Sequence, residues 1–402
     1  VTAGLIMQLL LGSKIIKVDM SDPYDRAMFS GSQKVLAIFL TIFNTVAYII
    51  GGAFGELNII NGTFLFLQLL LAGIIIILLD ELLQKGWGLG SGVSLFIAAG
   101  VAGQIFWNCF NFIGTEGDLS RGIVIAFFQA LANPSLMPQL LARGSQLPTI
   151  LGGFSTLIIF IFVIWFESTR IEIPLAYRGY RGFKGKYPMK LLYVSNIPVI
   201  LVNALYANFL FFGQLLAGPH ALLRVSNGGA IPDIWLNLIG VFDEQSQGAT
   251  TGNYLVPRGG LLYYLTPPQG LEQLINDPLR GIIYLVIFVF LCVMLGRVWV
   301  EVSGLAPRDI SRQIIDSGMQ IPGFRSSEKI IERILKRYIP TLIILNGIII
   351  AVMSFTADSL GALTSGTGLL IAIGIVHQYS EQIAKEAAAS QYPAMRAFLG
   401  LD

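Results

Sequence analysis

Long apolar stretches that alternate with short polar loops dominate this chain. Residues 35–55, 63–82, 149–166 and 281–300 are examples, and each is about as long as a helix that crosses a membrane's ~30 Å hydrocarbon core. None carries the polar stripe of a helix on the surface of a soluble protein. Because a lipid-embedded backbone must satisfy its own hydrogen bonds, the pattern predicts an all-α polytopic membrane protein.

Eight full spans and part of another are expected. The full spans are expected at residues 35–55, 63–82, 93–114, 149–166, 191–217, 281–300, 338–356 and 361–380. Residues 1–11 are apolar with no basic stretch before them, so the chain is expected to begin inside a membrane helix. The composition, 54% hydrophobic and 12% charged, agrees, because it excludes a soluble globule and a disordered chain.

Basic residues gather on alternate loops, and this sets the expected orientation. One side holds all but five of the 26 Lys and Arg residues, the exceptions being Arg121, Arg143, Arg224, Arg258 and Arg280. Loops rich in Lys and Arg stay in the cytoplasm. We therefore expect a multi-pass protein of the cell (plasma) membrane whose basic loops and C-terminus are cytoplasmic.

Two outside stretches are too polar to span the membrane. Residues 218–280 are rich in Gly, Pro and Asn and are expected to form a long external loop with little regular structure. A short helix over 270–278, ended by Pro278, is the one element expected there. In the stretch 115–148, residues 122–133 are expected to form an amphipathic helix that lies in the membrane interface.

Two inside loops are long and basic. Residues 167–190 are punctuated by Gly and favour an exposed hairpin. In the loop 304–337, Ser326 or Ser327 can cap a helix over 326–340. One face of that helix carries basic residues at i, i+3 and i+4, namely Arg333, Lys336 and Arg337. Two such projections favour a large anionic partner such as RNA; the alternative is that they set topology and contact anionic lipid.

The apolar stretches carry few groups capable of chemistry. They lack the midplane ionisable residue of an ion-coupled transporter, and the sequence has neither an HExxH metal motif nor a P-loop. Ser91 lies in a Gly-rich segment, but its only possible base, His377, is remote in sequence, so helix packing explains Ser91 better than catalysis. No catalytic site, metal or cofactor is expected.

Several motifs, in order along the whole chain, add a family resemblance. They are VTAGLIMQLLLGSKII (1–16), LLDELLQKGWGLGSGVSLFIAAG (78–100), RIEIPLA with KYPMKLLYVSNIPVIL (170–201), GFRSSEKIIERILKRYIP (323–340) and GALTSGTGLLIAIGIVHQYSEQ (361–382). The chain resembles SecY, the channel subunit of the protein-conducting translocon, and the loop 304–340 resembles the archaeal type.

The resemblance implies a SecY-like helical channel of two inverted halves. The family has ten spans, and about eight and a half are expected here, with the first span and the plug absent. Residues 1–114 would be the remainder of the N-terminal half, from the end of span 2 to span 5, and 115–148 an external connector with the interfacial helix. Residues 149–402 would be the C-terminal half, spans 6 to 10, with cytoplasmic loops 167–190 and 304–337.

The resemblance also implies three sets of functional residues. An apolar pore ring would contain Val1, Val93, Ile97, Ile200 and Leu363. A polar cluster at the lateral gate would contain Thr2, Asn44 and Asn208. Residues that bind the ribosome or another partner would be Arg178, Arg181, Lys184, Lys186, Arg325, Lys329, Arg333, Lys336 and Arg337.

The implied function is that of the central pore-forming subunit of the protein translocase, a passive channel and not an enzyme. It would conduct unfolded secretory polypeptides and release transmembrane segments laterally into lipid. The implied partners are a SecE/gamma-type clamp subunit, a small beta subunit, the ribosome or another cytosolic motor, signal sequences and nascent polypeptide, and membrane lipids. The alternatives are a polytopic solute transporter, which needs a midplane coupling residue, and an intramembrane hydrolase, which needs a Ser–His contact.

Overall fold

A computed structural model of the chain describes residues 2–12, 15–16, 18, 22–50, 54, 58–84, 92–113, 119–141, 143, 147–177, 184–218, 231–245, 254–316, 319–320 and 328–391. The larger helices are α1 (Thr2–Gly12), α2 (Pro23–Ile50), α3 (Ile59–Leu82), α4 (Gly92–Phe110), α5 (Ile123–Ala132), α7 (Ile150–Ser168), α8 (Ile197–Ala217), α12 (Pro278–Val302), α13 (Pro307–Asp316), α14 (Glu328–Ser359) and α15 (Gly366–Gln391). The smaller elements are η2 (Pro134–Leu136), α6 (Met137–Leu141), α9 (Asp233–Ile239), α10 (Leu261–Tyr264), α11 (Gly270–Asn276) and the strands β1 (Arg170–Tyr177), β2 (Lys184–Lys190), β3 (Val241–Gln245), β4 (Tyr254–Gly259) and β5 (Met319–Gln320).

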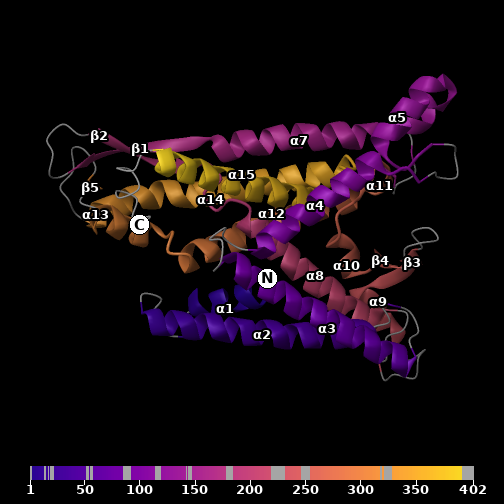
Figure 1. Cartoon of the computed structure of the whole chain (residues 1–402), viewed down its shortest axis with the longest axis horizontal. Helices are drawn as coiled ribbons and strands as arrows, with labels where there is room; N and C mark the ends of the chain where they lie inside the picture. The colour runs from indigo at the N-terminus through magenta and orange to yellow at the C-terminus, as the bar shows by residue number, and fades with distance from the viewer. Residues whose placement is uncertain are drawn as a thin grey trace.

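Most of the long helices run roughly along the long axis of the molecule (Figure 1). Within the described residues, six are long and apolar enough to cross a membrane, namely α2, α3, α7, α8, α12 and α14. Each of the eight expected spans coincides with one helix, although the ends differ. The two remaining spans correspond to α4, which has 19 residues, and to α15, which combines an apolar first half with a polar second half.

Local chemistry explains where several helices begin. Thr149 caps α7, because its side chain accepts a hydrogen bond from the Gly152 N–H. Asp277 caps α12 in the same way, and Pro278 occupies its first position, where a missing N–H costs nothing.

The expected helix over 326–340 and the span 338–356 are one continuous helix, α14, with Pro340 inside it. Pro340 has no N–H to donate to the Lys336 carbonyl one turn earlier, and the Thr341 hydroxyl donates to the neighbouring Arg337 carbonyl.

The largest core lies among α7, α8, α12, α14 and α15. Tyr284, Phe288 and Cys292 of α12 are buried in it against Val199 and Val202 of α8. By contrast, α3 has no buried side chain, although it contacts α2 and α4. It lies with α1 and α2 in the lower part of Figure 1.

The two ends of the molecule differ. One end, the hairpin end, holds the antiparallel hairpin β1–β2, and β5 adds to β1, so the two long basic loops share one sheet. The expected hairpin in 167–190 is therefore confirmed, except that residues 167–168 belong to α7. The opposite end, the connector end, holds α5 and α9–α11 (Figure 1).

The connector end corrects one expectation and confirms two. The stretch 218–280 was expected to have little regular structure, but its described part contains α9, α10, α11 and the antiparallel pair β3–β4. The correction arises because these short elements pack on a core of Leu236, Phe242, Leu262 and Ala217 that alternation over so few residues does not reveal. The helices expected in 270–278 and 122–133 are present as α11 and α5.

Candidate functional site

Four helices form a seam between the first part of the chain and the rest. Helix α1 packs against α2 and α12, and α2 packs against α8. Ala3 and Met7 of α1 are buried, so its contact is apolar. The rings of Tyr48 in α2 and Phe211 in α8 lie with their centroids 4.6 Å apart. The seam is thus a line of apolar contacts, which helices can break and re-form without leaving unpaired charges.

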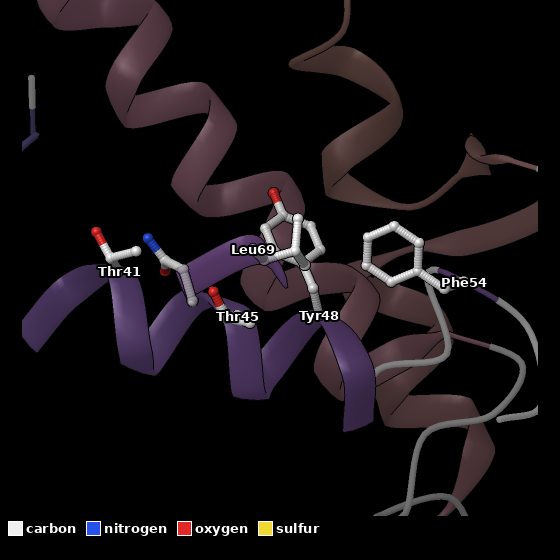
Figure 2. Close-up of a pocket in the computed structure, with 6 residues that line it drawn as sticks. Thr41, Thr45, Tyr48, Phe54 and Leu69 are labelled. Carbon is white, nitrogen blue, oxygen red and sulfur yellow. The ribbon is translucent and has the colours of Figure 1, made fainter. Parts of the chain in front are cut away.

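A cavity of about 380 Å³ lies beside this seam. Thr41, Asn44, Thr45 and Tyr48 line it from α2, with Leu69 of α3 and Phe54 on other sides (Figure 2). Their spacing of i, i+3, i+4 and i+7 places the α2 residues on one helix face. A face with three small polar side chains is therefore present within residues 35–50 of α2, which are otherwise apolar.

The expected polar cluster of the gate is only partly described. Asn44 lines the cavity. Asn208 of α8 is half-buried and donates its amide N–H to the Ala204 carbonyl one turn earlier, 2.7 Å away. Thr2 begins α1, but its side chain lies outside the described part. The hydrogen bond of Asn208 thus stays within its own helix.

Two of the five expected ring residues share one cluster. Ile97 of α4 and Ile200 of α8 both pack against one buried cluster, which consists of Ala98 of α4 and Ile371, Ala372 and Ile375 of α15. Val93 lies one turn before Ile97 in α4, with its side chain outside the description, and Val1 lies outside the described residues. The structure therefore brings α4, α8 and α15 together around an aliphatic contact.

Leu363 is not part of that contact. It lies in the turn before α15 and is buried against Leu119, Ile123 and Leu140 at the connector end. Its carbonyl accepts from the Asn108 amide at 2.6 Å, and its N–H donates to the Thr156 hydroxyl at 3.0 Å. This turn thus ties α4 to α7.

A second hydrogen bond joins α4 to the same turn. The Thr364 hydroxyl donates to the Gln104 side-chain oxygen at 2.9 Å. Next to it, the Asp358 carboxylate accepts from the Gly366 N–H at 2.7 Å and so caps α15. We call the two bonds that Gln104 and Asn108 make with this turn the α4 latch.

A charged junction fixes the base of the hairpin on α15. Glu381 forms ion pairs with Arg170 of β1 at 3.0 Å and with Lys190 of β2 at 3.2 Å. His377 Nε2 lies 3.4 Å from the same carboxylate. Desolvation raises the pKa of Glu381, but the hydrogen bond from Lys190 and the nearby positive charges outweigh it, so the pKa lies below its ordinary value. Glu381 therefore stays ionised and holds both strands.

The basic residues of α14 differ in their availability. Lys329, Arg333 and Arg337 are exposed, whereas Lys336 pairs with Glu332 at 2.8 Å. A further pair joins Arg312 of α13 to Glu328 at 2.9 Å. Exposed cations one turn apart can contact an anionic surface directly, while a paired one must first give up its carboxylate.

The other expected binding residues cannot be placed. Arg178, Arg181 and Arg325 lie outside the described residues, and Lys184 and Lys186 lie in β2 with side chains that are not described. Ser91, the weak candidate for a nucleophile, also lies outside them.

Sequence reasoning missed the residues that join distant segments. Glu381 and Asn108 bond partners that lie 191 to 255 positions away. Glu167 was assigned to a loop, but it is a buried residue of α7 that accepts from the Ser195 hydroxyl at 2.9 Å. The only signal in the sequence was the free-energy cost of placing a charged residue such as Glu167 next to an apolar stretch. This cost predicts that the charge has a partner but does not identify the partner.

Comparison with known proteins decides the family. A sequence model described as SecY matches residues 1–380. The chain belongs to the SecY family. The protein translocase subunit SecY of Pyrococcus horikoshii is 40% identical over 408 residues, which cover 98% of this chain and 82% of that protein. The SecY subunit of Methanococcus vannielii is 39% identical, with coverage of 100% and 82%. The resemblance drawn from the sequence motifs is confirmed.

Solved structures of similar proteins agree. A protein-conducting channel has a TM-score of 0.73 and 37% identity, covering 98% of this SecY chain and 81% of its own. The channel of the canine ribosome–channel complex from the endoplasmic reticulum has a TM-score of 0.70 and 36% identity, with the same coverage. The expected fold class, an all-α polytopic membrane protein, is confirmed.

Proposed function

We propose that this chain is the central pore-forming subunit of a protein translocase. It conducts unfolded secretory polypeptides across the membrane and releases transmembrane segments sideways into lipid. The observation that carries the proposal is the apolar seam between α1–α2 and α8–α12, beside a shared aliphatic contact of α4, α8 and α15. Membership of the SecY family favours this function over that of a solute transporter.

The aliphatic contact is the proposed constriction. Ile97 and Ile200 pack there against a cluster that includes Ile371 and Ile375. A narrow apolar constriction loses water and so blocks ions, yet aliphatic side chains can move apart around a passing chain. The proposed constriction also takes in the position of Val93, one turn before Ile97 in α4. Leu363 is buried in a separate cluster at the connector end. Such a channel is passive and needs a partner to supply energy.

The seam is the proposed lateral gate. Its contacts are apolar, and hydrogen bonds between helices in a membrane average only about 0.6 kcal/mol. The polar face of Thr41, Asn44, Thr45 and Tyr48 lies next to it. An apolar segment that enters the seam replaces helix–helix contacts with equivalent ones, so release into lipid needs little free energy.

The hairpin end is the proposed cytoplasmic end. It carries the hairpin, α13 and the exposed Lys329, Arg333 and Arg337, and the positive-inside rule orients such loops inward. The canine relative was solved bound to a ribosome, and the basic surface here fits the same partner. A clamp subunit and a small beta subunit complete the proposed complex, in an archaeal plasma membrane.

Cross-linking of an arrested nascent chain tests the function. In a background where Cys109 and Cys292 are replaced by Ala, a cysteine is introduced by Ile97→Cys, and the nascent chain carries one cysteine midway. We expect a disulfide cross-link when the chain spans the channel.

Leu95→Cys is the matched control, because Leu95 is exposed and lies on the opposite side of α4. Cross-linking at the Leu95 position alone, or at neither position while translocation proceeds, would contradict the proposed path.

A further inference from the structure

The short helix α9 has three different sides. Successive residues of a helix are rotated by about 100°. Leu236 and Ile239 share the side that packs into the protein core. Asp233 and Asn237, one turn apart, share a polar side. Ile234, Trp235 and Leu238 share the third side, where their side chains are 79%, 65% and 68% exposed.

The position of α9 relative to a membrane helix is fixed by its core contacts. Helix α9 packs on the last turns of α8, where Leu210 and Ala217 belong to the same cluster as Leu236 (Figure 1). These two residues are about 10 Å apart along α8, at 1.5 Å per residue. Amphipathic helices at a membrane surface bury their apolar side about 5–10 Å into the boundary between headgroups and acyl chains. The stretch of α8 between these two contacts is therefore about as long as the depth at which such helices lie.

We propose that α9 inserts its Ile234–Trp235–Leu238 side into the membrane leaflet at the connector end. Trp is enriched at membrane interfaces, because its ring is apolar and its N–H needs a polar partner. Helix α8, on which α9 packs, also exposes apolar side chains, namely Phe209 and Phe212. The occupant is therefore lipid at the headgroup boundary, and α9 anchors the outer end of a helix that borders the seam.

The distribution of polar and apolar residues over the three sides of α9 favours contact with lipid over contact with water or with another protein. A helix facing a water-filled funnel would carry polar residues on both of its sides that lie away from the core. On α9 only one of these sides is polar. The apolar side is three residues of a seven-residue helix, and such an area is small for a stable protein–protein interface, which buries about 800 Å² on each partner.

Tryptophan fluorescence tests the proposal. A single-Trp variant keeps Trp235 and replaces Trp87, Trp107, Trp165 and Trp299 by Phe. The purified complex is reconstituted in phosphatidylcholine–phosphatidylglycerol vesicles whose acyl chains are unbrominated, brominated near the headgroup or brominated near the bilayer centre. We expect a several-fold loss of Trp235 emission with the shallow bromines, a smaller loss with the deep ones, and little quenching by aqueous iodide.

The matched control places the probe on the polar side of the same helix. In a Trp-free background with Trp235→Phe, the variant Asn237→Trp should be quenched by iodide and not by brominated lipid. Iodide quenching of Trp235 would mean that this side faces water, and protection from both quenchers would mean that protein covers it; either result overturns the proposal. Lipid quenching at both positions would overturn the three-sided orientation. Retained translocation activity shows that each variant is folded.

Discussion

Asn208 is a polar residue of α8, a helix that borders the seam and is long enough to span the membrane. Its amide N–H is satisfied by the Ala204 carbonyl at 2.7 Å within the same helix. The side-chain oxygen must be desolvated whenever an apolar segment lies against it. Asn208 therefore adds a small cost to the entry of such a segment.

Replacing Asn208 by Leu should lower the hydrophobicity that a segment needs to enter lipid. The replacement removes a polar group that must be desolvated and adds an apolar side chain, and one Leu contributes about 0.3–0.6 kcal/mol on the insertion scale. We expect the half-insertion point to shift by about one Leu in a graded series of test segments. Asn203→Leu, the same change on another side of α8, is the control, and an unchanged threshold for Asn208→Leu would remove Asn208 from the gate.

Asn108 makes the shorter bond of the α4 latch, donating to the Leu363 carbonyl at 2.6 Å. Replacing it by Ala leaves that carbonyl unpaired, and measured hydrogen bonds between membrane helices average about 0.6 kcal/mol, with a maximum of about 1.7 kcal/mol. We expect Asn108→Ala to lower the free energy of unfolding in detergent by that amount. Asn61→Ala, at an exposed position of α3, should have no measurable effect. Equal effects would mean that the latch contributes nothing specific.

At the scale of elements, the charged junction attaches the hairpin to α15, and α15 also supplies Ile371 and Ile375 to the proposed constriction. One helix therefore contacts both the basic hairpin and the proposed constriction. Glu381 joins both strands, so neutralising it should free the hairpin base without disturbing the core.

Glu381→Gln should increase amide hydrogen exchange in residues 170–177 and 184–190 and leave α12 unchanged. Because the folded-state pKa of Glu381 is lowered, the attachment is complete above the unfolded value of about 4.3 and is lost as pH falls through the lower folded-state pKa. Exchange in the wild type should therefore approach that of the variant, measured at the same pH, once the pH is below the folded-state pKa. Glu328→Gln, which breaks only the pair with Arg312, is the control, and equal exchange in both variants would argue against the attachment.

The sequence predicted the elements that are marked by a long apolar stretch. Every expected span coincides with a helix, because twenty apolar residues leave the backbone few alternatives in lipid. It failed at β3, β4 and α9, whose few residues are stabilised by Leu236 and Phe242 in a shared core. It also could not find the α4 latch or the junction at Glu381, since each depends on which distant segments meet.

At the scale of the whole molecule, the two ends have different chemistry. The hairpin end exposes cations on α14, and the connector end exposes apolar residues on α9. The first kind of surface binds phosphate-rich partners with an affinity that depends on salt, because bound counterions are released. The second kind binds lipid, with little dependence on salt.

Reversing Arg333 and Arg337 together to Glu should weaken ribosome binding of the purified complex. Each phosphate contact that is lost should flatten the plot of log affinity against log salt by about one unit, so a change of about two is expected. Co-sedimentation with ribosomes over a range of salt concentrations measures both quantities. Arg258→Glu is the control, because Arg258 lies in β4 at the connector end and should not meet the ribosome. If the double variant binds with unchanged affinity and slope, the exposed face of α14 is not the contact, and its cations would then serve topology and lipid binding.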